Sequence, residues 1–153
     1  MFTMQRRIFL KGGLAAGAAG VAAGLLPQAV LAAWSKEAFE SKDMKGALKA
    51  LFGSDAATPG QIKIKAPDIA ENGAVVPVTV STDLEGVEAM AIFATKNNFP
   101  LTSEYALGEG ALPFVSTRIK MGKTADVVAV VKAGGKLYSA KKAVKVTIGG
   151  CGG

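Results

Sequence analysis

The sequence predicts a mainly β protein: an immunoglobulin-like antiparallel β-sandwich, preceded by an N-terminal helix and followed by a short glycine-rich tail. Two observations predict this fold class. From Gln61 onward, apolar residues recur at every second position in six to eight short runs, which Gly, Asn, Pro and Asp turns separate. No strand–helix–strand alternation follows residue 60, which disfavours a Rossmann or flavodoxin arrangement.

A helix is expected over residues 34–52, where apolar side chains share one face at helical spacing. These side chains are Met44, Ala47, Leu48, Leu51 and Phe52. Ser35 or Ser41 is the expected N-cap, and Gly53 stands where a helix-ending glycine belongs. Gly46 weakens the middle of this helix, so a kink or a division into two short helices is left open.

The strand candidates follow a turn-rich linker at residues 54–60. They are residues 61–66, 74–80, 87–95, 103–107, 112–121, 125–132 and 136–148. Pro77 suggests an edge strand or a bulge, and Gly134-Gly135 fits a tight hairpin turn. Three phenylalanines are interpreted first as ordinary core residues, with a partner interface as the alternative: Phe93, Phe99 and Phe114.

The composition excludes several classes of enzyme. The 153 residues include no His and one Cys. Without His there is no Ser-His-Asp triad, no Cys-His pair, and no haem or zinc held by imidazole. With one Cys there is no four-cysteine metal cluster, no C-x-x-C couple and no internal disulfide. We therefore expect a chain without a metal site or cofactor of its own.

Residues 1–32 are typical of a cleaved secretory signal peptide, with a basic start, an apolar middle and a small-residue end. The pair Arg6-Arg7, followed by Phe-Leu-Lys, resembles the twin-arginine export signal, so a periplasmic location is expected. The expected mature part is then a helix-plus-sandwich domain over residues 33–148 and an arm over 149–153. Because residues 12–33 are uncharged, a retained membrane anchor is the alternative.

The net charge of +6 is partly a property of this signal. Removing residues 1–32 subtracts two Arg and one Lys and no acid, which leaves 15 basic against 12 acidic residues, a net +3. So small an excess predicts no nucleic-acid binding. The densest basic cluster, Lys141-Lys142 with Lys145, is interpreted as a solvated strand face.

The feature that carries chemistry is the sequence Gly149-Gly150-Cys151-Gly152-Gly153. Four glycines bring no apolar area and have the largest backbone entropy to lose, so we expect a mobile tail. Five extended residues span about 17 Å, enough to carry a thiol into a narrow pocket of another protein. The pattern favours a covalent carrier arm with the thiol as its handle; an incidental tail is the alternative.

Three segments together resemble one known family. They are the twin-arginine signal, the stretch KAPDIAENGAVVPV at residues 65–78, and above all the terminal GGCGG. The chain is similar along essentially its whole length to SoxY, the sulfur-carrier subunit of the bacterial thiosulfate-oxidising Sox system. Gln5, in place of the usual Ser or Thr before the arginines, is a minor departure.

The resemblance implies a heterodimer with SoxZ, a second β-sandwich protein, and leaves open a heterotetramer joined through Cys151. It implies that Cys151 covalently carries S-thiosulfonate and persulfide intermediates. The haem protein SoxAX would load thiosulfate, the metal-dependent hydrolase SoxB would release sulfate, and a sulfane dehydrogenase or another route would take the outer sulfur. The chain would then be a non-catalytic, substrate-bearing subunit without stable membrane association after signal cleavage.

Two other classes of function remain as alternatives. One is an exported immunoglobulin-like binding or chaperone module, which binds a client by strand addition and in which Cys151 is incidental. The other is a thiol redox protein, which is disfavoured because the chain has no resolving cysteine.

Overall fold

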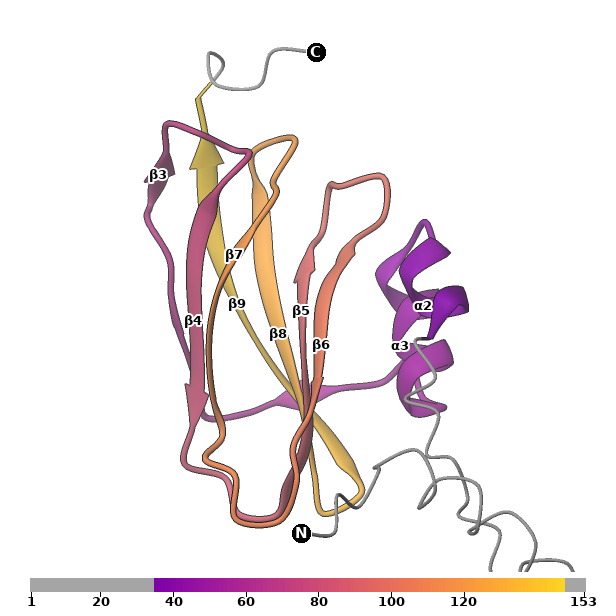
Figure 1. The fold of residues 1–153 in the computed structure, drawn as a ribbon. Helices are drawn as coiled ribbons and strands as arrows, with labels where there is room; N and C mark the ends of the chain where they lie inside the picture. The colour runs from indigo at the N-terminus through magenta and orange to yellow at the C-terminus, as the bar shows by residue number, and fades with distance from the viewer. Residues whose placement is uncertain (1–34, 148–153) are drawn as a thin grey trace, which may run out of the picture. The chain divides into compact units, whose positions relative to one another are not determined.

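The computed structural model describes residues 35–147, which form two packed β-sheets with two short helices beside them (Figure 1). The helices are α2 (Lys36–Glu40) and α3 (Met44–Phe52). The strands are β1 (Thr58–Pro59), β2 (Ile62–Lys65), β3 (Ile69–Ala70), β4 (Val76–Thr82), β5 (Val87–Ala94), β6 (Leu101–Ala106), β7 (Phe114–Ile119), β8 (Ala125–Ala133) and β9 (Lys136–Val146). The predicted β-sandwich with helical structure before it is confirmed.

The larger sheet has the strand order β1-β9-β8-β5-β6, and β3 also pairs with β9. The smaller sheet has the order β2-β4-β7. The pairings are antiparallel except where the two-residue strands β1 and β3 run parallel to β9. Because β9 accepts both short strands along one edge, its two ends are fixed by chain segments from the first half of the sandwich.

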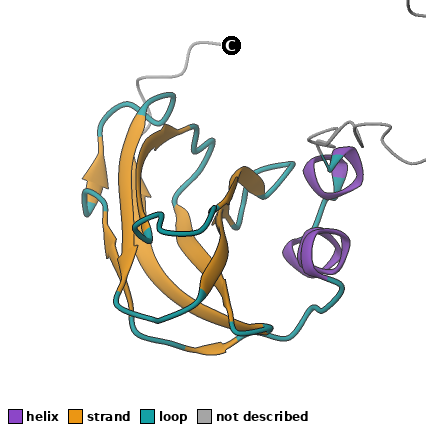
Figure 2. Cartoon of the chain, turned by 60° about the horizontal axis from the view of Figure 1, so that its bottom comes forward, coloured by secondary structure: helices purple, strands orange, loops and turns teal. Residues whose placement is uncertain are grey.

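The central strands β5 and β8 of the larger sheet are buried on both faces. The inner face of this sheet, which includes Met90, Ile92, Val127 and Val131, packs on Val78 and Val80 of the smaller sheet. The outer face, which includes Phe93, Val128 and Val130, packs on Ala47 and Leu48 of α3. Figure 2 shows the helices outside the two sheets. Burial of this apolar surface stabilises the fold by roughly 25 cal/mol per Å². Double coverage explains why β5 and β8 are apolar almost throughout.

The helical segment is divided at residues 41–43 rather than at Gly46. Asp43 is the N-cap of α3: its backbone is extended, and its carboxylate accepts a 2.7 Å hydrogen bond from the Gly46 amide. Ser35 occupies the N-cap position of α2, as expected, but forms no side-chain cap hydrogen bond. Ser41 is instead the C-cap of α2, and its hydroxyl donates to the Asp43 carbonyl, so the expectation for Ser41 was wrong. Gly53 ends α3 at φ 73°, which confirms the expected left-handed glycine.

Two expectations about the strands are corrected. Residues 54–60 are not only a linker, because β1 lies within them. The strand that contains Pro77 is not an edge strand, because β4 lies between β2 and β7. Pro77 is nevertheless tolerated: the pairing of β4 with β2 ends at Thr79, so no hydrogen bond to β2 is required from the missing N–H.

The three phenylalanines separate into two groups. Phe93 is fully buried, as expected, whereas Phe99 and Phe114 are 48% and 57% exposed, so the core interpretation was wrong for these two. The hairpin at Gly134-Gly135 is confirmed, with φ of 55° and 73°. In residues 35–147, no helix is long and apolar enough to cross a membrane.

Candidate functional site

The residues that the sequence singled out lie outside the described part of the chain. These are the thiol of Cys151, the arm glycines Gly149, Gly150, Gly152 and Gly153, and the export residues Arg6 and Arg7. The end of β9 and the segments around it are described. The position of the end of β9 is the place on the sandwich from which the chain continues toward residues 149–153.

The end of β9 is held on one edge by β3 and its neighbours. The Lys145 amide donates to the Asp68 carbonyl at 2.9 Å, and the Thr147 amide donates to the Ala70 carbonyl at 3.1 Å. Figure 1 shows β3 alongside the end of β9. Backbone hydrogen bonds therefore hold the chain through Thr147, four residues before Cys151.

Thr124 holds the opposite edge of β9. Its hydroxyl accepts a hydrogen bond from the Val146 amide at 2.9 Å and lies 3.3 Å from the Val146 carbonyl, to which it can donate. Val144, two residues earlier, is fully buried. The strand end is thus fixed on both sides by residues from different parts of the sequence.

Gly73 lies next to Val146 at the end of β9. It belongs to the stretch at residues 65–78 that resembles the carrier family. Its carbonyl accepts from the Met121 amide at 2.7 Å. A Cβ added at Gly73 would lie 2.4 Å from the Met121 carbonyl oxygen and 2.8 Å from Cγ1 of Val146. Any larger residue would therefore press on both the loop before β8 and the end of β9.

We expect Gly73→Ala to destabilise the sandwich by about 1–3 kcal/mol, because backbone must move to admit the methyl group. The denaturant midpoint should fall, and the amide resonances of Val146 and Thr147 should shift. Gly108→Ala is the matched control: nothing lies within 4 Å of its added Cβ. If the two variants had equal midpoints, the close packing at Gly73 would not constrain the strand end.

The described residues offer little metal chemistry. Within residues 35–147, no group of three or more His, Cys, Asp or Glu side chains is placed to hold a metal ion. The basic cluster on β9 faces solvent in part: Lys141 pairs with Asp126 at 3.6 Å and Lys142 with Asp68 at 3.1 Å. These ion pairs leave the cluster no unusual excess of charge.

Comparison with known proteins gives a family match. A family model described as "Sulfur oxidation protein SoxY" matches residues 48–151, a segment that ends at Cys151. The solved structure of the sulfur carrier protein SoxY from Chlorobium limicola f thiosulfatophilum is 46% identical, with a TM-score of 0.58. That match covers 67% of this chain and 94% of the other.

A more distant likeness concerns the fold alone. Superoxide reductase (neelaredoxin) from Ignicoccus hospitalis matches with a TM-score of 0.51 and 20% identity, over 57% of this chain and 81% of that one. No curated protein matches this chain. Of these two structures, the sulfur carrier is therefore the one that is similar in sequence as well as in fold.

Proposed function

Since the chain belongs to the SoxY family of sulfur oxidation proteins, we propose that it carries thiosulfate-derived sulfur covalently on the Cys151 thiol. The family match carries this proposal, because the matched segment extends to Cys151. The family is one of sulfur carriers, which implies a non-catalytic role. The chain's single cysteine makes Cys151 the one side chain of this sequence able to form a persulfide.

The proposed cycle begins with an oxidative and a hydrolytic step. In the first, the Cys151 thiol loses its proton to water, its sulfur bonds to the outer sulfur of thiosulfate, and two electrons pass to the haem enzyme SoxAX, which leaves Cys–S–S–SO₃⁻. In the second, a metal-activated water in SoxB attacks the sulfonate sulfur and releases sulfate and two protons. Cys151 is left as a persulfide anion. A sulfane dehydrogenase would oxidise its outer sulfur to a sulfonate, with oxygen from water and the electrons passed to that enzyme, or another acceptor would take this sulfur. A further hydrolysis of the sulfonate would then release sulfate and regenerate the thiol.

The fixed end of β9 supports a swinging-arm role for residues 149–153. Thr147 is the last described residue, and its amide hydrogen bond to Ala70 fixes the origin of the arm. From Thr147 to Cys151, the chain can extend at most about 14 Å. With only glycines at positions 149 and 150, the segment adds no side-chain bulk that would obstruct entry into an enzyme channel.

A heterodimer with SoxZ is part of the proposal. Two exposed apolar residues near the start of β7, an edge strand of the smaller sheet, support a partner surface: Leu112 is 81% exposed and Phe114 57%. The proposal also includes export by the twin-arginine pathway through Arg6-Arg7, already bound to this partner, with the cycle running in the periplasm. Cleavage after residue 32 would release the carrier from the membrane.

Deleting Gly149-Gly150 should slow loading of Cys151 while leaving the unfolding midpoint of the sandwich unchanged. The deletion shortens the reach beyond Thr147 from about 14 Å to about 7 Å. Loading is followed by intact mass after mixing the chain with thiosulfate and the haem enzyme. Replacing the same pair by Ser-Ser keeps the length and is the control, which should load far faster than the deletion. Equal rates for wild type and deletion would refute the role of arm length.

A mixture of purified Sox enzymes tests the proposed function as a whole. Thiosulfate oxidation, measured as electrons transferred to the haem enzyme, should require this chain together with its partner. Omission of the chain should reduce the rate to background. Oxidation that proceeds equally well without the chain would show that it is not the carrier.

A further inference from the structure

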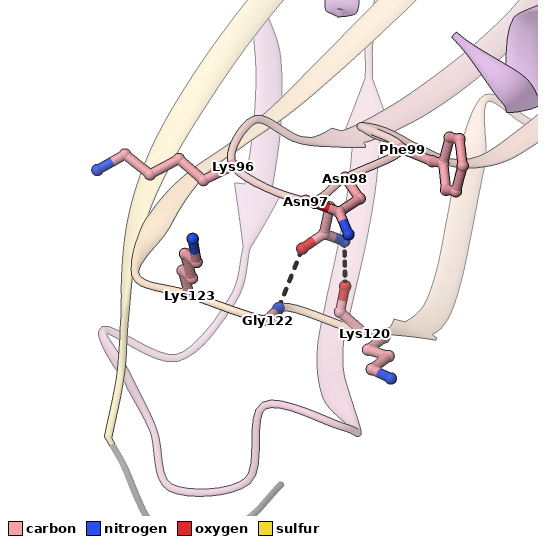
Figure 3. Close-up of a pocket in the computed structure, with 7 residues that line it drawn as sticks. All are labelled: Lys96, Asn97, Asn98, Phe99, Lys120, Gly122 and Lys123. Carbon is pink, nitrogen blue, oxygen red and sulfur yellow. Dashed lines mark hydrogen bonds between the residues drawn. The ribbon is translucent and has the colours of Figure 1, made fainter. Parts of the chain in front are cut away.

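A basic pocket lies between the turn from β5 to β6 and the loop from β7 to β8 (Figure 3). Its volume is about 320 Å³, and three lysines line it: Lys96 from the turn, and Lys120 and Lys123 from the loop. In Figure 3, the side chains of Lys96 and Lys123 lie on one side of Asn97 and that of Lys120 on the other. The pocket is large enough for a small oxyanion and its hydration water.

Asn97 joins the two walls of this pocket. Its amide nitrogen donates to the Lys120 carbonyl at 2.7 Å, and its carbonyl oxygen accepts from the Gly122 amide at 3.0 Å (Figure 3). Thr95 adds a second connection, because its amide and its hydroxyl both donate to the Asp126 carbonyl. The backbones that carry the three lysines are therefore fixed relative to one another.

In the described residues, the three lysines of the pocket have no acidic partner. Over residues 35–147, none of the three lysines forms an ion pair, and no carboxylate is among the side chains that line the pocket. Asp126, a nearby acid in the sequence, pairs with Lys141 instead. All three lysines are exposed, and Lys96 and Lys123 lie on one side of Asn97, so an anion bound there would pair with two cations.

The pocket adjoins the end of β9. Lys123 precedes Thr124, whose hydroxyl is hydrogen-bonded to Val146. From Val146 to Cys151, the chain can extend up to about 17 Å. A group carried on Cys151 could therefore return to the pocket of its own sandwich.

We infer that this lysine pocket binds the sulfonate of the S-thiosulfonate group that Cys151 carries. The inference rests on the proposed function and adds a docking site for the cargo between enzymes. Docking is non-covalent: the ammonium groups of Lys96 and Lys123, which lie on the same side of Asn97, pair with sulfonate oxygens, and no bond forms or breaks. Lys120, on the other side of Asn97, adds to the positive charge of the pocket. Free thiosulfate has the same oxyanion chemistry, so the test separates the carried group from the free ion.

The test begins by loading the full chain chemically, together with any partner that copurifies. The Cys151 thiolate attacks tetrathionate, gives Cys–S–S–SO₃⁻ and releases thiosulfate, so loading needs no Sox enzyme. Intact mass confirms the adduct before any other measurement. Nuclear magnetic resonance then compares the amide resonances of residues 96–99 and 120–123 in the loaded and reduced protein.

We expect loading to shift these resonances and replacement of all three lysines by alanine to abolish the shifts at equal loading. Lys136→Ala is the matched control and should keep them, because Lys136 is an exposed lysine at the opposite end of β9. Lys132 is unsuitable, since it pairs with Glu88 at 2.9 Å and lowers the pKa of that carboxyl.

Three results would overturn the inference. The first is a loaded protein whose pocket resonances do not move. The second is a Cys151→Ser chain in which free thiosulfate, at the concentration of the protein, produces the same shifts. The third is a triple-lysine variant that keeps the loading shifts but no longer binds a Sox enzyme, which would identify the pocket as a protein-docking surface. Each leaves the carrier proposal intact, because loading is measured separately by mass.

Discussion

Cys151→Ser should reduce thiosulfate oxidation by the complete Sox mixture to the rate measured without this chain. Serine keeps the size of the side chain but has no sulfur that can form a disulfide-type bond to thiosulfate. Electron transfer to the haem enzyme and sulfate release should be lost together, since both follow from the same adduct. The unfolding midpoint should equal that of the wild type, which separates loss of chemistry from loss of fold.

A relocated thiol serves as the control for position. In a Cys151→Ser, Ser54→Cys chain, the one thiol lies on the exposed segment that follows α3. Tetrathionate should still modify this thiol, whereas the haem enzyme should not load thiosulfate onto it. Oxidation at the wild-type rate by either variant would contradict the assignment of Cys151 as the carrier.

Phe93→Ala should lower the free energy of unfolding by about 3–5 kcal/mol. The Phe93 side chain is fully buried between the outer face of the larger sheet and the helices, where it packs with Leu48 and Val130. Its removal leaves a cavity at the site where α2 and α3 are attached, so the helical circular dichroism signal should be lost at a lower denaturant concentration than that at which the strands unfold. The denaturant midpoint and the slope of the transition measure the loss of stability, and circular dichroism along the same denaturant series measures the loss of helix.

Phe114→Ala is the matched control, because it removes the same side chain from an edge strand where 57% of the residue is exposed. Its cost in the isolated chain should be within about 0.5 kcal/mol. Equal destabilisation by the two variants would mean that the cluster beneath the helices does not hold them to the sheet.

Much of the fold could be predicted from periodicity and turns. The alternating run at residues 61–66 and the apolar runs of β5 and β8 are long enough to predict strands, and Gly134-Gly135 predicted the hairpin. The two-residue strands β1 and β3 could not be predicted, since neither has room for a period of two. The place of the division into two helices could not be predicted either: Ser35 lies at the N-cap of α2, whereas α3 begins at Asp43, whose carboxylate accepts from the Gly46 amide.

The candidate site also has residues that the sequence could indicate and residues that it could not. Cys151 could be proposed from the sequence alone, as the one thiol of the chain and with two glycines on each side. The residues that hold the end of β9 could not be identified from the sequence alone. The Ala70 carbonyl accepts from the Thr147 amide, and the Thr124 hydroxyl accepts from the Val146 amide. These contacts depend on how strands distant in sequence come together, which periodicity does not determine.

Intact mass of the protein purified from cells that are oxidising thiosulfate tests the central claim most directly. Carriage on Cys151 predicts additional masses that correspond to an S₂O₃ group and to one extra sulfur, and peptide mapping should locate both on Cys151. Reduction should remove them, and a Cys151→Ser chain from the same cells should have neither. An unmodified Cys151 throughout active thiosulfate oxidation, with the serine variant supporting the same rate, would contradict the account.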